Sequence, residues 1–62
     1  GLIDWAAITG RAAKEAAFME FLRMYTERPT ATDVQRYFQV TEKTAYANLT
    51  RYWPLREREL QR

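Results

Sequence analysis

Apolar residues recur at steps of three and four along residues 10–28, the spacing of a helix with one buried face. Arg11, Glu15, Glu20 and Arg23 lie elsewhere on the same helical wheel. The apolar positions are Ala13, Ala17, Phe18, Phe21, Leu22 and Tyr25. We expect this helix to continue until Pro29, because the residue before a proline is driven away from helical backbone angles.

A short apolar segment, residues 2–8, precedes this helix and is interrupted by Thr9 and Gly10. We expect a short helix or a packed arm. The segment is far too short to span a bilayer, and no basic segment precedes it. We therefore expect a cytoplasmic (intracellular) protein without a membrane partner.

After Pro29, the residues from Thr30 to Asp33 form the pattern of a capping box with Asp in place of Glu. Such a cap contributes on the order of 1 kcal/mol. Val34 and Phe38, four residues apart, are then the core-facing pair of a second helix.

Thr41 is expected to cap a third helix that runs to about Trp53. Pro54 should stop that helix and begin a last short one, residues 54–60. No segment alternates at period two, so we expect no sheet. The predicted fold is all-α: one domain, residues 1–62, with a three-helix core and short additional N- and C-terminal helical segments.

The composition changes this picture mainly by what it excludes. The 62 residues include no Cys and no His, so there is no disulfide and no common set of zinc ligands. There is also no phosphate-cradling glycine loop and no carboxylate pair beside an obvious apolar pocket. We therefore expect that the protein is not an enzyme and that it binds no metal, no cofactor and no small-molecule substrate. A net charge of +2 is only a weak indication of an acidic partner.

Much of the buried area must come from large apolar side chains, since a chain this short has a small core. The expected core residues are Phe18, Phe21, Leu22, Val34, Phe38, Leu49 and Tyr52. Trp5 and Trp53 are expected to close the two ends of this core, with a contact to another protein as the alternative for one of them.

The helix predicted for residues 41–53 has two distinct faces. At 100° per residue, Ala45, Leu49 and Tyr52 lie within about 60° of one another and form the inward face. The opposite face carries Lys43, Tyr46, Ala47 and Thr50, with Thr44 and Arg51 on one flank. Most of these outward side chains are short or flat, and cations frame them.

The sequence TATDVQRYFQVTEKTAYANLTRY, residues 30–52, resembles the helix-turn-helix superfamily of DNA-binding proteins. The likeness is greatest to the trihelical core of winged-helix bacterial regulators, although no wing is evident. Phe38 matches the large apolar residue before the turn, Val40 the apolar residue of the turn, and Thr41 the residue that opens the recognition helix. The long preceding helix would complete the core, and the motif covers residues 30–53.

The resemblance implies that residues 41–53 enter the major groove of double-stranded DNA. Side chains near base edges would be those of Lys43, Thr44, Tyr46, Ala47 and Thr50. Thr41 and the first amides of the helix suit a phosphate, and Arg51, Arg36 and Arg28 are candidates for backbone contacts. The chain would be a small transcriptional regulator or the DNA-binding module of a larger replication or recombination protein. A homodimer or the parent protein's other domains would then add contacts.

The chain departs from the pattern of this superfamily at two positions. Gln39 occupies the turn position usually held by Gly, where a left-handed conformation would cost roughly 1 kcal/mol. Gln35 replaces a small Ala where the two helices approach each other, so its amide needs a partner or the helices must separate.

Charge leaves a rival interpretation open. Residues 41–53 carry a formal charge of only +1, from Lys43 and Arg51 (+2) against Glu42 (−1), whereas many DNA-binding domains are far more basic. The alternative is a helical protein–protein interaction module of the same shape that binds no nucleic acid. An accessory domain of a larger enzyme is a third possibility.

Overall fold

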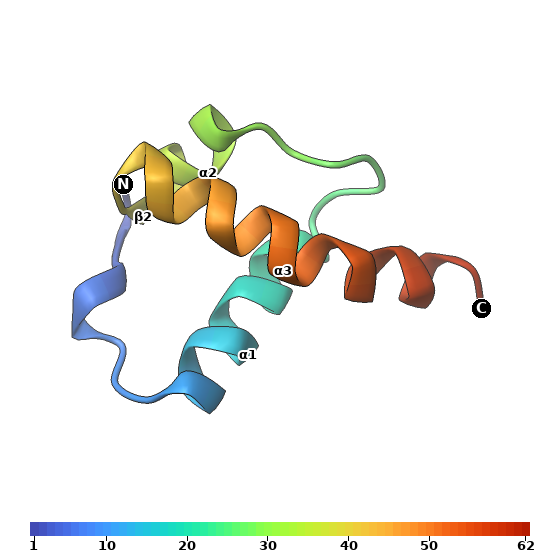
Figure 1. Ribbon diagram of the computed structural model, residues 1–62, viewed down its shortest axis with the longest axis horizontal. Coiled ribbons are helices and arrows are strands. Elements are labelled where there is room, and N and C mark those ends of the chain that lie inside the picture. The colour runs from blue at the N-terminus through green and yellow to red at the C-terminus, as the bar shows by residue number, and fades with distance from the viewer.

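The first long helix, α1 (Arg11–Leu22), begins directly after Gly10. Gly10 has a φ of 91°, in the left-handed region that only glycine adopts readily, so the chain can turn sharply into the helix there. The computed structural model describes all residues from 1 to 62, and its three α-helices pack around one core (Figure 1).

α1 ends at Leu22, so the prediction of a helix reaching Pro29 is wrong. Two i to i−3 hydrogen bonds tighten the chain after Leu22, from Met24 to Phe21 and from Tyr25 to Leu22. If the helix continued, the carbonyl group of Tyr25 would need the N–H of residue 29, which is a proline and has none. The guanidinium group of Arg56 donates to this carbonyl oxygen instead, at 3.1 Å.

The second helix, α2 (Ala31–Tyr37), begins at the predicted capping box. The amide of Asp33 donates to Thr30 Oγ1 at 3.1 Å, and the amide of Thr30 donates to Asp33 Oδ2 at 2.9 Å. Both bonds join residues three positions apart, which is why the local sequence was sufficient to predict them.

The third helix, α3 (Glu42–Leu60), is one continuous helix, so the predicted stop at Pro54 and the separate last helix are wrong. Thr41 caps it as predicted. Pro54 removes one hydrogen bond within the helix. Contacts on either side hold the helix together, because Trp53 is buried, Leu55 packs against the core, and Arg56 reaches the Tyr25 carbonyl.

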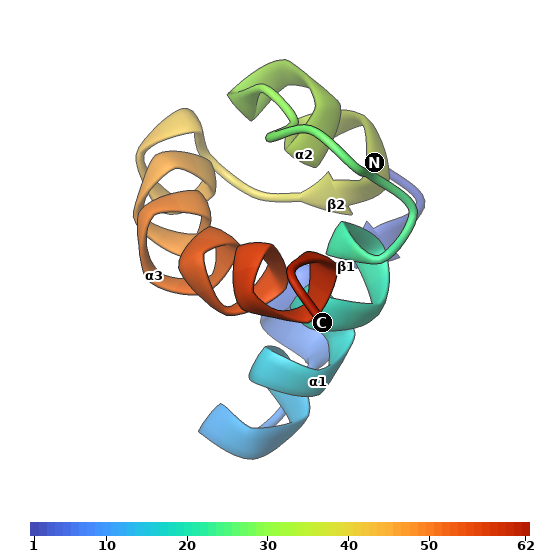
Figure 2. The same ribbon diagram turned by 90° about the vertical axis from the view of Figure 1, so that its right-hand side faces the viewer.

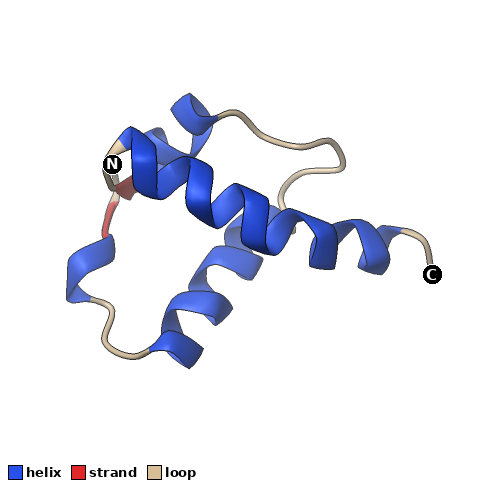
Figure 3. Cartoon of the chain, viewed as in Figure 1, coloured by secondary structure: helices blue, strands red, loops and turns tan.

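Two short strands, β1 (Ile3–Asp4) and β2 (Phe38–Gln39), pair in parallel with Ile3 opposite Phe38 (Figure 2). The expectation of no sheet is wrong, and the fold is mostly α rather than all-α (Figure 3). Strands of two residues are too short to produce a period-two pattern. Between β1 and α1, the apolar N-terminal segment forms a short 3₁₀ helix, η1 (Trp5–Ala7).

The core is a cluster of eleven buried residues supplied by all three helices and β2. Its members are Phe18, Met19, Phe21, Leu22, Ala31, Val34, Phe38, Ala45, Leu49, Tyr52 and Trp53. All seven residues predicted for the core are in it. Trp5 joins from the side, since its ring packs edge-on against Phe18 and Phe38 with centroid distances of 6.0 and 5.1 Å. Ala13, which the helical spacing placed on the buried face of the first helix, is exposed.

The turn between α2 and α3 accommodates both glutamines that depart from the helix-turn-helix pattern, Gln35 and Gln39. No residue other than glycine has a positive φ, so Gln39 carries no left-handed strain. Gln35 has the partner that its amide needs, because its Nε2 donates to the carbonyl oxygen of Val40 at 3.2 Å. This hydrogen bond links α2 to the turn that leads into α3.

None of the helices combines the length and the apolar composition that a bilayer crossing needs.

Candidate functional site

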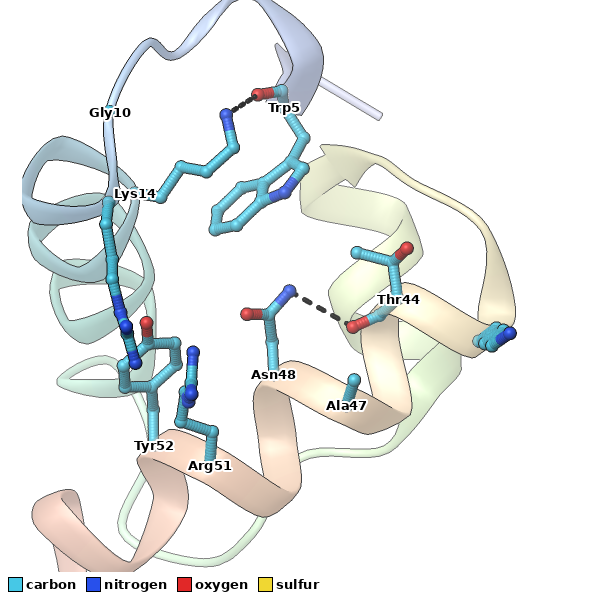
Figure 4. A pocket seen from close by; sticks show the side chains of 10 residues that line it. Trp5, Gly10, Lys14, Thr44, Ala47, Asn48, Arg51 and Tyr52 are labelled. Atoms are coloured by element: carbon cyan, nitrogen blue, oxygen red, sulfur yellow. Dashed lines mark hydrogen bonds between the residues drawn. The ribbon is translucent and has the colours of Figure 1, made fainter.

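A cleft of about 560 Å³ lies between the N-terminal part of the chain and the first half of α3 (Figure 4). Its two walls come from segments that are distant in sequence. Residues of η1 and the start of α1 form one wall, and residues of α3 form the other. The lining residues are Trp5, Gly10, Arg11, Lys14, Lys43, Thr44, Ala47, Asn48, Arg51 and Tyr52.

The cleft is strongly basic. Four of the ten cationic side chains of the protein line it, Arg11, Lys14, Lys43 and Arg51, while none of the eight acidic residues does. None of these four cations forms an ion pair; the ion pairs of the protein use other cations, namely Arg23, Arg36 and Arg56. A low net charge therefore conceals a local concentration of positive charge.

The N-terminal wall is held in place by Lys14. Its ammonium group donates hydrogen bonds to the carbonyl oxygens of Trp5 and Ile8 and lies 5.3 Å from the centre of the Trp5 ring. Figure 4 shows the Lys14 side chain reaching across to Trp5 at the top of the cleft. These contacts fix the chain segment before Gly10 against the first turns of α1.

The α3 wall combines small and polar side chains. Asn48 is half-buried, and its Nδ2 donates to the backbone carbonyl of Thr44 at 3.0 Å (Figure 4). This bond orients the amide and uses one of its two N–H donors, so one donor and the side-chain oxygen have no protein partner. Ala47 lies one turn from Thr44, and its short side chain leaves this part of the cleft open.

The outward face predicted from the wheel is present in the structure. Lys43, Tyr46, Ala47, Thr50 and Arg51 are exposed, and Thr44 is half-buried. Four of them, Lys43, Thr44, Ala47 and Arg51, belong to both this face and the cleft. The cleft is thus continuous with the free face of α3.

Thr41 is engaged at the start of α3. Its hydroxyl oxygen accepts from the amide of Thr44 at 3.2 Å and donates to the Thr44 hydroxyl at 3.1 Å. The capping role accounts for its side chain, which leaves the amides of Glu42 and Lys43 as the free donors of the first turn.

The structure does not bring Arg36 and Arg28 into the cleft. Arg36 lies 4.0 Å from Asp33 and lines a second, smaller hollow of about 250 Å³ that includes no residue of α3. Arg28 is exposed in the segment between α1 and α2 and lines neither hollow.

Six lining residues were not among the sequence-predicted site residues: Trp5, Gly10, Arg11, Lys14, Asn48 and Tyr52. Asn48 follows Thr44 by four positions and precedes Arg51 by three, so the helical wheel could have placed it on the same flank. Arg11 and Lys14 gave no such signal, because they meet α3 only through the tertiary packing of α1.

The arrangement is suited to binding by charge and hydrogen-bond donation. Four cations without an ion pair line one open cleft, together with Asn48, whose side-chain oxygen and second N–H have no protein partner. Such a surface favours an extended polyanion. No protein-family model, no curated protein and no solved structure matches the chain, so its geometry alone has to carry a functional conclusion.

Proposed function

We propose that the protein binds double-stranded DNA, with α3 lying in the major groove. One observation carries this proposal. The exposed face of α3 adjoins a cleft lined by four cations that form no ion pair and by no acidic residue. Phosphate contacts supply much of the affinity in DNA binding, and they need cations beside the inserted element.

The shape of the outward face supports insertion into a groove. The major groove is about 12 Å wide and admits one α-helix. Between Lys43 and Arg51, this face carries Tyr46, Ala47 and Thr50, which form no hydrogen bond or ion pair through their side chains. Ala47 and Thr50 offer methyl groups for a thymine, and the hydroxyl groups of Thr50 and Tyr46 can reach base edges.

The α2–turn–α3 unit is consistent with a helix-turn-helix assignment, which we retain as part of the proposal. Both helices begin with a threonine cap, and Gln35 bonds to Val40 in the turn between them. In this arrangement α2 supports α3 while the outward side of α3 stays free. We assign base and groove contacts to Lys43, Thr44, Tyr46, Ala47 and Thr50, and a phosphate contact to Arg51.

A single module of this size buries too little surface for tight, specific binding. A second copy of the chain, or other domains of a longer protein, would add the remaining contacts. In either case we place the protein among transcriptional regulators or among the DNA-binding modules of replication and recombination proteins.

A second function, protein–protein interaction, is favoured by a different observation. Three large apolar side chains are more than half exposed: Leu2 at 84%, Met24 at 58% and Tyr46 at 55%. Of these, Tyr46 lies on the same face of α3 that DNA would contact, so a partner protein would compete with DNA for it.

Two substitutions on α3 test the proposal. Lys43→Ala and Arg51→Ala remove cations that make no bond within the protein, so helicity by circular dichroism should stay unchanged. Binding of a labelled duplex, followed by fluorescence anisotropy, should weaken for both. Arg58→Ala is the matched control, since Arg58 is an exposed arginine of α3 outside the cleft. Equal affinities for wild type, both cleft variants and the control would remove this face from consideration.

A further inference from the structure

We infer that one phosphodiester strand of the bound duplex lies in the cleft, and that Arg11 binds a phosphate of this strand from the N-terminal wall. The inference rests on the proposed function and extends it. It assigns a DNA contact to the first turn of α1, a part of the chain that lies outside the helix-turn-helix motif.

The distribution of cations in the cleft favours an extended polyanion. Lys43 and Arg51 are eight residues apart on α3, which corresponds to about 12 Å along the helix axis at 1.5 Å per residue. Arg11 and Lys14 stand on the opposite wall. The positive charge is therefore spread along a channel with two walls, and this distribution suits a chain of phosphates better than a single small anion.

The position of the cleft beside α3 also fits a DNA strand. A helix in the major groove has a phosphodiester backbone on each side of it. The cleft borders α3 along the flank of Thr44, Asn48 and Arg51, where one of these two backbones would run. Arg36, in contrast, lines a hollow without any residue of α3. Arg36 therefore adds no charge to this flank of α3.

Arg11 and Lys14 have different roles on this wall. Arg11 is exposed and forms no ion pair, so its guanidinium group is free to bind a phosphate in a bidentate manner. Lys14 already donates to two backbone carbonyl groups. It is a positioning residue that holds Trp5 in place and adds charge to the channel.

Trp5 provides an optical signal for the occupied cleft. Its ring is half-buried and lines the channel, whereas Trp53 is buried in the core and is not part of the lining. A phosphodiester strand in the cleft should change the emission of Trp5, and Trp5→Phe should abolish that change.

The test compares Arg11→Ala and Arg11→Glu with Arg62→Ala and Arg62→Glu in the full 62-residue chain. Arg62 is an exposed arginine at the far end of the chain, so the pairs are matched in charge. The probe is a labelled mixed-sequence duplex of about 20 base pairs, titrated at several salt concentrations, a length that spans about two helical turns.

Arg11→Ala should weaken duplex binding about threefold, and it should lower the slope of log K against log salt by about 0.9, as expected for one lost phosphate contact. Arg11→Glu should weaken binding further. An acidic residue in the first turn of a helix favours the fold, so this variant should be at least as stable as the wild type. The Arg62 variants should bind within about twofold of wild type.

Three results would overturn the inference, and they can be told apart. If the wild type binds the duplex and Lys43→Ala weakens it, but the Arg11 and Arg62 variants behave alike, then the strand does not occupy the cleft and the proposed function stands. If inorganic pyrophosphate alone changes Trp5 emission at micromolar concentration and displaces the duplex, the cleft is a small-anion site. If the wild type binds no duplex, both the proposed function and the inference fail.

Discussion

The ammonium group of Lys14 donates a hydrogen bond of 3.1 Å to the carbonyl oxygen of Trp5, nine residues earlier in the chain. A second bond joins the same group to the carbonyl oxygen of Ile8. One side chain of α1 thereby fixes the carbonyl groups at both ends of the segment that begins with η1. The N-terminal wall of the cleft depends on this contact, because Gly10 separates the segment from α1 and imposes no rigidity.

Lys14→Met should loosen that wall. Methionine keeps an apolar stem of similar length against the Trp5 ring but removes both hydrogen bonds. We expect the free energy of unfolding to fall by about 1.5 to 3 kcal/mol, the usual contribution of a hydrogen bond to a charged group. Urea denaturation followed by circular dichroism measures this. Lys43→Met is the control, since Lys43 is exposed; equal midpoints for the two variants would contradict the role assigned to Lys14.

Thr30→Ala should lower the free energy of unfolding by about 1 kcal/mol, because it removes the side-chain half of the capping box of α2. Thr32→Ala changes an exposed threonine of the same helix whose side chain makes no hydrogen bond, so it should be close to neutral. Thermal unfolding of the two variants gives the comparison. A larger loss for Thr32→Ala than for Thr30→Ala would be incompatible with this cap.

Pro54→Ala should stabilise the protein. Residue 54 lies inside α3, where an alanine could donate its N–H to the carbonyl of Thr50 and proline cannot. The gain can reach about 3 kcal/mol, less whatever the proline contributes by restricting the unfolded chain. Differential scanning calorimetry should show a higher Tm. A lower Tm would mean that α3 is not continuous through this position.

At acidic pH, the free energy of unfolding should depend on two carboxylates that stabilise the folded state when they are ionised. The hydrogen bond from the backbone amide of Thr30 lowers the pKa of Asp33 below its usual 3.8, and the side chain of Thr30 lowers it further. The side-chain hydrogen bond from Arg23 lowers the pKa of Glu59 below its usual 4.5, with a smaller effect from Arg56. Both folded-state pKa values lie below those of the unfolded chain.

It follows that both groups stabilise the fold fully above about pH 4.5, and that this stabilisation is lost as the pH falls through their folded-state pKa values. Urea midpoints measured from pH 6 to pH 2 should decline through this range. The decline should be shallower for Glu59→Gln and for Asp33→Asn than for wild type. Profiles that run parallel for all three proteins would contradict these ion-pair and cap assignments.

Local patterns predicted the parts of the fold that depend on neighbours in sequence. The caps at Thr30 and Thr41 bond to residues three positions away, and the inward face of α3 follows from helical spacing alone. For the same reason the outward face, from Lys43 to Arg51, was predicted correctly as exposed, apart from the half-buried Thr44.

Tertiary contacts decided the parts that the local patterns missed. Pro54 reads as a helix end in sequence, but Trp53 and Leu55 pack on either side of it and keep α3 continuous. The pairing of β1 with β2 joins residues 35 positions apart, and Arg11 reaches the α3 flank only because α1 packs across α3. Arg11 and Lys14, two of the four cations that line the cleft, were therefore absent from the site predicted from the sequence.

The most direct measurement of the central claim is the affinity of the wild-type chain for a mixed-sequence duplex as a function of salt concentration. If α3 and the cleft bind DNA, binding is measurable at low salt, and log K falls linearly with log salt at a slope that reflects several phosphate contacts. Absence of binding at low salt, even at high micromolar protein, would contradict the account and favour a protein partner for this face of α3.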